Sequence, residues 1–266
     1  MPVPQLHYYD ISHGVVAFST TRHGGYSKGN YGEFNINGYC GDNKDDVEKN
    51  RRLLAVELGV DESRIILPHQ THGVETRQIA GDFLSLPANV RQMILEGVDA
   101  VMTNMKGVCI GVSTADCIPI ILYDANHHAT CAVHAGWRGT VARILLKAVA
   151  DMRLAYGTEA AQLKAVVGPG ISLDAFEVGN EVYEEFANAN FDMAPISKQI
   201  KVEGSDFEFK WHIDLPECNR QQLVMAGVKE ENIQMCRICT YSNTQDYFSA
   251  RQLGKDSGRI FTGIML

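Results

Sequence analysis

Four short apolar runs in the middle of the chain constrain its fold more than any other feature. Gly, Asp and Asn residues bound these runs, which cover residues 100–102, 108–112, 118–123 and 130–133. Continuous apolar runs of this length are typical of strands buried inside a sheet. The pattern therefore predicts a central sheet built from this part of the chain.

Helices are predicted on both sides of this region. Asp45 or Asp46 is a good N-cap for a helix that ends at Gly59, because glycine suits the left-handed backbone of a helix C-terminus. Apolar residues also recur at helical spacing within residues 141–157. Further helices are expected over residues 180–188 and 216–226, and further strands over 15–20, 165–167, 207–213, 233–238 and 259–265.

Nothing in this pattern divides the chain. No internal repeat, low-complexity linker or shift in composition marks a boundary, and strands and helices occur in both halves. This mixture favours an α+β or layered α/β domain over a regular βαβ winding. Residues 1–266 are therefore interpreted as one domain.

The composition excludes several classes of partner. The chain has 24 Lys and Arg against 32 Asp and Glu, a formal net charge of -8, and it has no basic run. Such a chain is not expected to bind nucleic acid or an anionic membrane surface. No apolar stretch reaches the roughly 18–20 residues that span a bilayer, and no signal peptide is recognised, so the expected location is the cytoplasm. The seven cysteines, an odd number in a long chain, are expected to be reduced.

Three residues with metal-binding side chains stand near the ends of predicted strands. Cys117 and His134 flank two of the apolar runs, and His72 follows a third apolar segment, residues 65–67. One thiolate and two imidazoles are a ligand set for zinc, and the fourth position stays open for water or substrate, as in catalytic sites. Zinc bound in this way lowers the pKa of its water toward about 7.

Two other interpretations use the same residues. In the first, no metal binds, and Cys117 is the nucleophile of a hydrolase or deamidase with His134 as its base. In the second, Cys117 and the two histidines bind copper for an oxidation. The copper interpretation ranks last, because a multi-copper oxidase needs more histidines than the nine in this chain provide.

Several motifs together resemble those of one protein family over nearly the whole chain. The matching segments are TRHGG at 21–25, FN at 34–35, QTHG at 70–73, TADCIP at 114–119, HAGWRG at 134–139, FSAR at 248–251 and GR at 258–259. On these motifs the chain resembles the YfiH-type family. Its members are variously called laccase-domain proteins, polyphenol oxidases or purine nucleoside phosphorylases.

The resemblance implies a fold, a metal and a reaction. The implied fold is a single-domain four-layer α/β/β/α sandwich with mixed sheets, and the implied metal is zinc held by His72, Cys117 and His134. The implied activity is phosphorolysis of adenosine, inosine and methylthioadenosine to the free base and ribose 1-phosphate, with adenosine deamination as a second reaction. Purine nucleosides and phosphate are then the partners. Copper-dependent phenol oxidation is the other activity given for similar proteins, and the oligomeric state stays open.

Phosphorolysis needs side chains that hold an anion. Arg22, Arg138 and Arg251 are candidate phosphate ligands, and Asn35, in a family motif, is a further candidate for substrate or phosphate binding. Deamination needs an acid that protonates the departing ammonia. Asp116 is a candidate for that acid because it adjoins Cys117.

Overall fold

The four central apolar runs form strands of two sheets rather than one. Three of them become β5 (Ala100–Thr103), β7 (Ile118–Asp124) and β8 (Ala129–Ala135) of a six-stranded sheet. The fourth becomes β6 (Cys109–Thr114) of a five-stranded sheet. The prediction of one central sheet is therefore wrong. All four strands are buried throughout, and an apolar run that is covered on both faces does not reveal which sheet it joins.

The six-stranded sheet carries antiparallel strands in its centre and parallel pairs at its edges. Its other strands are β4 (Thr76–Gln78), β9 (Lys164–Val167) and β13 (Ile233–Met235), and the order is β13-β9-β7-β8-β5-β4. The pairs β9–β7, β7–β8 and β8–β5 are antiparallel, whereas β13–β9 and β5–β4 are parallel. The start of β7, the end of β8 and the start of β5 therefore lie at the same edge of the sheet.

The five-stranded sheet joins the two ends of the chain. Its other strands are β1 (Leu6–Tyr9), β2 (Val16–Thr20), β3 (Ile65–Ile66) and β14 (Ile260–Met265), and the order is β1-β2-β14-β6-β3. Apolar side chains of both sheets share one buried cluster, which includes Val112 and Ile264 from this sheet and Ile121 and Val166 from the other. The two sheets thus pack face to face.

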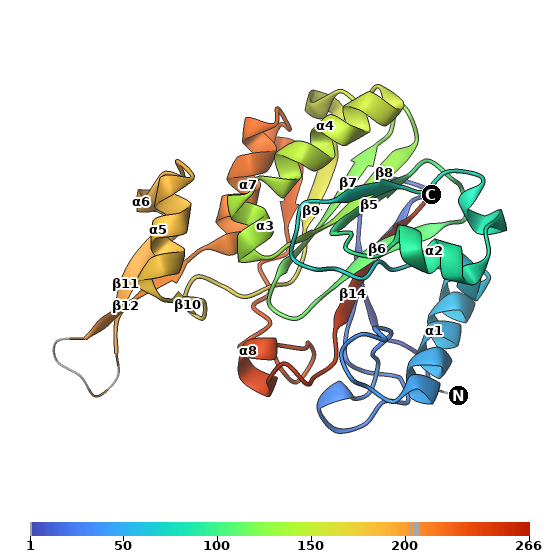
Figure 1. The fold of residues 1–266 in the computed structure, drawn as a ribbon, viewed down its shortest axis with the longest axis horizontal. Coiled ribbons are helices and arrows are strands. Elements are labelled where there is room, and N and C mark those ends of the chain that lie inside the picture. Colours follow the sequence, from blue (N-terminus) through green and yellow to red (C-terminus); the bar gives the residue numbers. More distant parts are fainter. Residues whose placement is uncertain (1, 203, 205–207) are drawn as a thin grey trace.

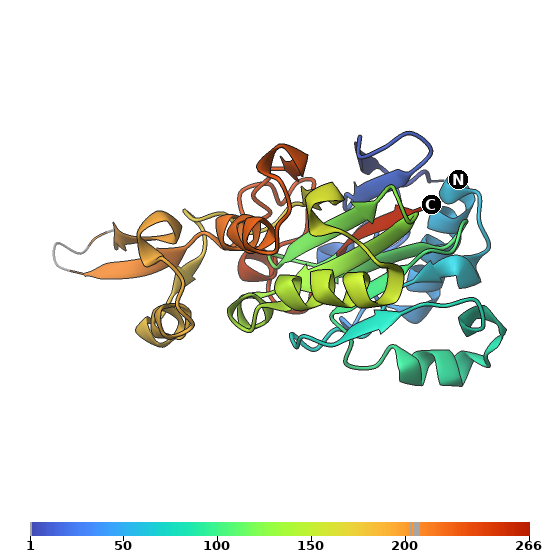
Figure 2. The ribbon, with the colours of Figure 1, turned by 90° about the horizontal axis from the view of Figure 1, so that it is seen from above.

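Helices cover the outer face of each sheet. Helix α1 (Lys44–Leu58) covers the five-stranded sheet, where Leu54 packs with Phe18 and Phe261. Helices α4 (Ile144–Tyr156) and α7 (Leu215–Met225) cover the six-stranded sheet. Figure 1 and Figure 2 show the resulting layers from two directions. The predicted four-layer α/β/β/α arrangement with mixed sheets is confirmed for residues 2–202, 204 and 208–266, which this computed structural model describes.

Two predicted helices differ in detail from the structure. Asn43, rather than an aspartate, caps α1, because its side chain accepts the N–H groups of Asp45 and Asp46; the predicted C-cap at Gly59 is confirmed. The helix expected within residues 141–157 is divided into α3 (Trp137–Val141) and α4, because Arg143 takes a left-handed backbone with φ 62°.

An arm extends from the layered body. It consists of a three-stranded antiparallel sheet in the order β10-β12-β11 and two helices, and Figures 1 and 2 show it projecting on one side. Its elements are β10 (Glu177–Val178), α5 (Asn180–Asn188), α6 (Met193–Ile196), β11 (Ser197–Lys201) and β12 (Phe209–Ile213). Helix α5 has the predicted bounds. The start of the strand predicted over 207–213 falls on residue 207, which lies outside the described residues.

Short elements complete the body. These are α2 (Ala88–Ile94), α8 (Ala250–Leu253) and the 3-10 turns Gly29–Tyr31, Glu62–Arg64, Phe83–Ser85, Ala160–Gln162 and Glu230–Asn232. Within the described part of the chain, no helix is long and apolar enough to cross a membrane.

Candidate metal centre

The three predicted metal ligands meet at one edge of the six-stranded sheet. Cys117 immediately precedes β7, and His134 lies near the end of β8, opposite Pro119 in the antiparallel register. His72 comes from the loop that follows β3. One ligand atom from each residue lies within 4.8 Å of those of the other two, and the Cys117 Sγ–His72 Nε2 distance is 3.8 Å. The structure therefore brings together side chains that are up to 62 positions apart in the sequence (His72 to His134).

A buried carboxylate fixes two of these ligands at once. The Asp99 side chain, which is fully buried, accepts a hydrogen bond of 2.7 Å from Nδ1 of His134. The same carboxylate accepts the backbone N–H groups of Thr71, His72 and Gly73 at 2.7–3.2 Å. These bonds hold the His72 loop, in which His72 itself has a positive φ of 64°. Because Asp99 occupies Nδ1 of His134, Nε2 of that ring is free to face the other two ligands.

The charges of the site favour a thiolate. Burial raises the pKa of the Cys117 thiol, but attraction to His134 and hydrogen bonds with His134 and His72 outweigh burial and lower the pKa below its ordinary value. Burial lowers the pKa of His134, and the Cys117 thiolate and Asp99 reverse this and raise it. Cys109 and Cys131 differ, since burial without such partners raises the pKa of both thiols.

This donor set fits a zinc ion. Zinc lies about 2.0–2.3 Å from nitrogen and sulfur ligands, which places tetrahedral ligand atoms roughly 3.3–3.8 Å apart. The 3.8 Å between Cys117 and His72 is within that range. The backbone also leaves room, because a Cβ added to Gly136 would lie 2.9 Å from Cδ2 of His72 and 3.1 Å from Sγ of Cys117. The same set of one soft and two borderline ligands also accepts copper, so the geometry does not identify the metal.

The three ligands open onto a pocket of about 290 Å³. Residues of both sheets, of three loops and of α8 line it: Asn37, Tyr39, Cys40, His69, Gln70, His72, Ser113, Thr114, Ala115, Cys117, His134, Ala250 and Arg259. The Gln70 amide exchanges two hydrogen bonds with the Ser113 backbone, at 2.8 and 2.7 Å. The Tyr39 ring stacks on His69 with centroids 4.1 Å apart. The vacant corner of the ligand set thus faces a polar cavity with one aromatic wall.

The described residues that line this pocket do not include the other four predicted site residues. Arg22 donates to the carbonyl oxygens of Gly32, at 2.8 Å, and Thr244, at 2.6 Å, and so joins two distant loops. Asn35 is fully buried, and its Oδ1 accepts the backbone N–H of Arg259 at 3.2 Å. Both side chains brace the walls of the pocket.

The two remaining arginines are exposed at its periphery. Arg138, in α3, lies over the Trp137 ring at 4.3 Å. Arg251, in α8, donates from Nη1 to the Glu177 carbonyl at 3.1 Å and so connects α8 with the base of the arm.

Asp116 has a structural role in this conformation. Its Oδ1 accepts the Thr240 hydroxyl and its Oδ2 accepts the Arg251 backbone N–H, both at 2.7 Å. With both oxygens engaged, its carboxylate ties α8 and the Thr240 segment to the residue before Cys117.

Sequence reasoning missed two residues of the site. The first is Asp99, whose signal was a charged residue enclosed by Val98 and Ala100 at the start of an apolar run. The second is Arg259, which lines the pocket and whose guanidinium donates to the carbonyl groups of Lys255, Ser257 and Gly258. Arg259 belongs to a motif of the resemblance but has no neighbouring residue that hints at a ligand.

Comparison with known proteins decides the family. A family model described as multi-copper polyphenol oxidoreductase laccase matches residues 16–266. The chain belongs to this family. The resemblance inferred from the motifs is therefore confirmed, and the laccase-domain fold accounts for both sheets and the arm.

Relatives of this laccase-domain chain have enzyme names. It is 44% identical over 259 residues to a Bacteroides thetaiotaomicron protein named purine nucleoside phosphorylase, which covers 97% of this chain and 93% of the relative. It is 42% identical over 251 residues to adenosine deaminase RL5 of an unknown prokaryotic organism, which covers 94% of each. The crystal structure of the hypothetical protein YfiH of Bacillus licheniformis matches with a TM-score of 0.89 at 27% identity, over 99% of this chain and 97% of that one. These relatives support an enzymatic activity.

Proposed function

We propose that this protein is a zinc-dependent purine nucleoside enzyme. It cleaves adenosine, inosine and methylthioadenosine with phosphate to the free base and a ribose 1-phosphate, and it also deaminates adenosine. The observation that carries the proposal is the convergence of His72, Cys117 and His134 on a polar pocket of about 290 Å³. The names of the relatives supply the substrate class.

The arrangement favours catalytic over structural zinc. A structural site is usually closed by four protein ligands, whereas the cluster in the described part of the chain has three. When bound there, the metal would supply a Lewis acid that polarises a substrate oxygen or activates a water. The protein's own part is to keep the Cys117 thiol ionised, to hold His134 through Asp99, and to present the open corner to the pocket.

Each reaction places a different demand on the pocket. In phosphorolysis, a phosphate oxygen bonds to the anomeric carbon while the bond to the purine nitrogen breaks, and the base leaves with the electron pair. In deamination, a water oxygen bonds to the purine carbon and ammonia leaves. We propose that Arg259 helps to hold the phosphate, because it is the arginine that lines the pocket. Arg138, Arg22, Arg251 and Asn35 remain predicted contributors to substrate or phosphate binding; Arg22 and Asn35 would act through the pocket walls.

One experiment tests the proposal. Protein reconstituted with zinc, with copper or left without metal is incubated with adenosine in the presence and absence of phosphate, and the products are separated by liquid chromatography. We expect adenine and ribose 1-phosphate only when phosphate is present, and inosine in either case, with zinc required for all products. Full turnover without metal, or no turnover of any purine nucleoside, would contradict the proposal.

A metal-free cysteine hydrolase is the second candidate. The observation that favours it is the lowered pKa of Cys117 beside His134, which is the pairing of an activated thiol nucleophile and its base. The same experiment separates the two, because a cysteine hydrolase keeps its activity after chelation and loses it on alkylation with iodoacetamide.

A further inference from the structure

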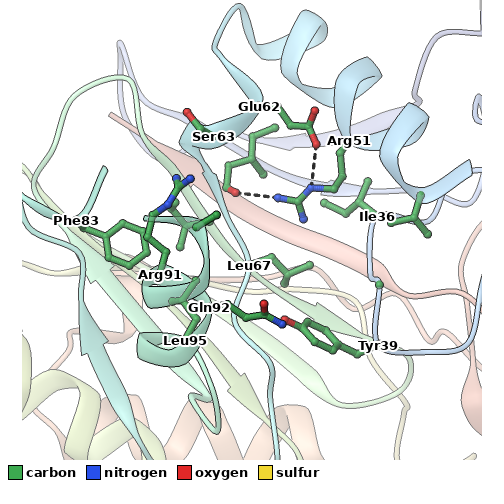
Figure 3. A pocket seen from close by; sticks show the side chains of 15 residues that line it. Ile36, Tyr39, Arg51, Glu62, Ser63, Leu67, Phe83, Arg91, Gln92 and Leu95 are labelled. Carbon is green, nitrogen blue, oxygen red and sulfur yellow. Dashed lines mark hydrogen bonds and ion pairs between the residues drawn. The ribbon is translucent and has the colours of Figure 1, made fainter. Parts of the chain in front are cut away.

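A larger cavity lies away from the metal ligands, between α1, α2 and β3. Its volume is about 520 Å³, within the range of small-molecule sites. Figure 3 shows its lining, with Arg91 and Arg51 on opposite sides, Leu67 between them, and Tyr39 and Gln92 at one end. Among the described residues, Tyr39 alone lines both this cavity and the pocket at the metal ligands.

The floor of the cavity is apolar. Four of its side chains are almost fully buried yet face the cavity, and a fifth, Leu67, is 7% exposed. The four are Ile36, Val47, Ile65 and Phe83. A ligand that covers this floor must present an apolar surface, since burying a polar group there without a hydrogen bond is costly.

Guanidinium groups make the walls cationic. Arg51 donates from Nη2 to the Ile65 carbonyl at 3.2 Å, and its Nε lies 3.4 Å from the Glu62 carboxylate. Arg91 has no ion pair within the described residues, and its buried Nε–H finds no acceptor there. A buried N–H without an acceptor is uncommon in proteins and is satisfied when a ligand supplies one. Arg91 therefore points to an anion.

We propose that this cavity is a second ligand site that takes a small monocarboxylate with an apolar body. The carboxylate pairs with Arg91, opposite Arg51, and the apolar body covers the floor. A single negative charge is favoured, because Glu62 already neutralises part of Arg51 and repels a more highly charged anion. The inference is independent of the proposed nucleoside chemistry, since it uses none of the metal ligands.

Calorimetric titration of the zinc-loaded protein with 3-phenylpropionate and with its neutral amide tests the proposal. The titrations are repeated with Arg91→Gln and, as a control with the same change of charge, Arg153→Gln, whose side chain is exposed on α4. We expect saturable binding of the acid to the wild type and to Arg153→Gln, and binding at least about tenfold weaker for the amide and for Arg91→Gln. Unchanged turnover of Arg91→Gln confirms that the variant is folded.

Three results would overturn the proposal. One is the absence of saturable binding of both 3-phenylpropionate and octanoate. Another is equal affinity of the acid for the wild type and Arg91→Gln. The third is complete displacement of the acid by adenosine, which would make the cavity an extension of the nucleoside pocket through Tyr39. Because binding is measured without turnover, failure here leaves the proposed function untouched.

Discussion

Opposite edges of the six-stranded sheet each carry a buried aspartate bonded to a histidine. At one edge Asp99 accepts from Nδ1 of His134 at 2.7 Å, and at the other Asp124 accepts from Nδ1 of His127 at 2.8 Å. Both carboxylates also accept backbone N–H groups. The histidines differ, because the His134 side chain is 3% exposed whereas that of His127 is 40% exposed.

The difference lies in what the far side of each ring meets. His134 faces Cys117 and His72, which lie within 4.8 Å, whereas His127 belongs to a hairpin loop in contact with solvent and to no ligand cluster in the described residues. An aspartate–histidine pair therefore orients an imidazole but does not make a site. The site requires that other strands deliver further ligands to the same edge.

Removing the thiol is expected to break the comparison most strongly. Cys117→Ala should lose the metal and reduce nucleoside turnover by about 1000-fold or more, since a bound metal contributes several kcal/mol to the transition state. Metal content by mass spectrometry and turnover by chromatography measure the effect. Cys131→Ala, in the middle of the same sheet, is the control and should keep both. Normal metal content in Cys117→Ala would exclude Cys117 as a ligand.

Exchanging the two aspartates one at a time sharpens the contrast. Asp99→Asn should weaken zinc binding by roughly 10–100-fold, because it removes the carboxylate that holds His134 and the His72 loop. Asp124→Asn is the matched control, and its zinc affinity should equal that of the wild type. Competition with a chromogenic chelator gives both affinities. Similar losses in the two variants would mean that zinc binding merely follows stability.

A smaller effect is expected from crowding the ligands. Gly136→Ala should weaken zinc binding about tenfold, because the new Cβ would lie 2.9 Å from a carbon of the His72 ring. The backbone φ of −71° suits alanine, so the cause is contact rather than strain. Gly81→Ala, where nothing lies within 4 Å, should bind zinc normally. The same chelator competition checks this, and an unaffected Gly136→Ala would show that His72 moves away without cost.

The weakest expected effect concerns the edge without ligands. Burial raises the pKa of Asp124, but hydrogen bonds with Thr158, His127 and Asn126 outweigh burial and lower it. The carboxylate therefore stabilises the fold above its unfolded pKa of about 4, and this contribution fades as pH falls through the lower folded value. Asp124→Asn should cost about 1 kcal/mol at pH 7 and less at pH 3, as measured by urea unfolding. A cost that grows toward acid would reverse the sign of this assignment.

Much of the fold could be predicted from local sequence patterns. The bounds of α5 agree with the prediction, and α7 begins one residue before the expected 216, because periodicity and capping residues are local. The division into two sheets could not be predicted, since both faces of each sheet are covered. The polar strand β11, with the sequence SKQIK, was not predicted because it lies in the arm and is largely exposed.

The candidate site divides in a similar way. His72, Cys117 and His134 were predicted, since their residue types and their positions at strand ends indicate metal chemistry directly. Asp99 was missed, because its role depends on partners 27 and 35 positions away that only the folded sheet brings near. Whether Arg22, Asn35, Arg138 and Arg251 contact substrate stays a prediction.

The bonds from Asp99 to the His72 loop and to His134 form without any ion. In zinc fingers the chain folds around its metal and unfolds when the metal is withdrawn. Here the empty cradle keeps its shape, so loading becomes a local event that follows folding. The identity of the resident metal is then decided by which ion the surroundings supply.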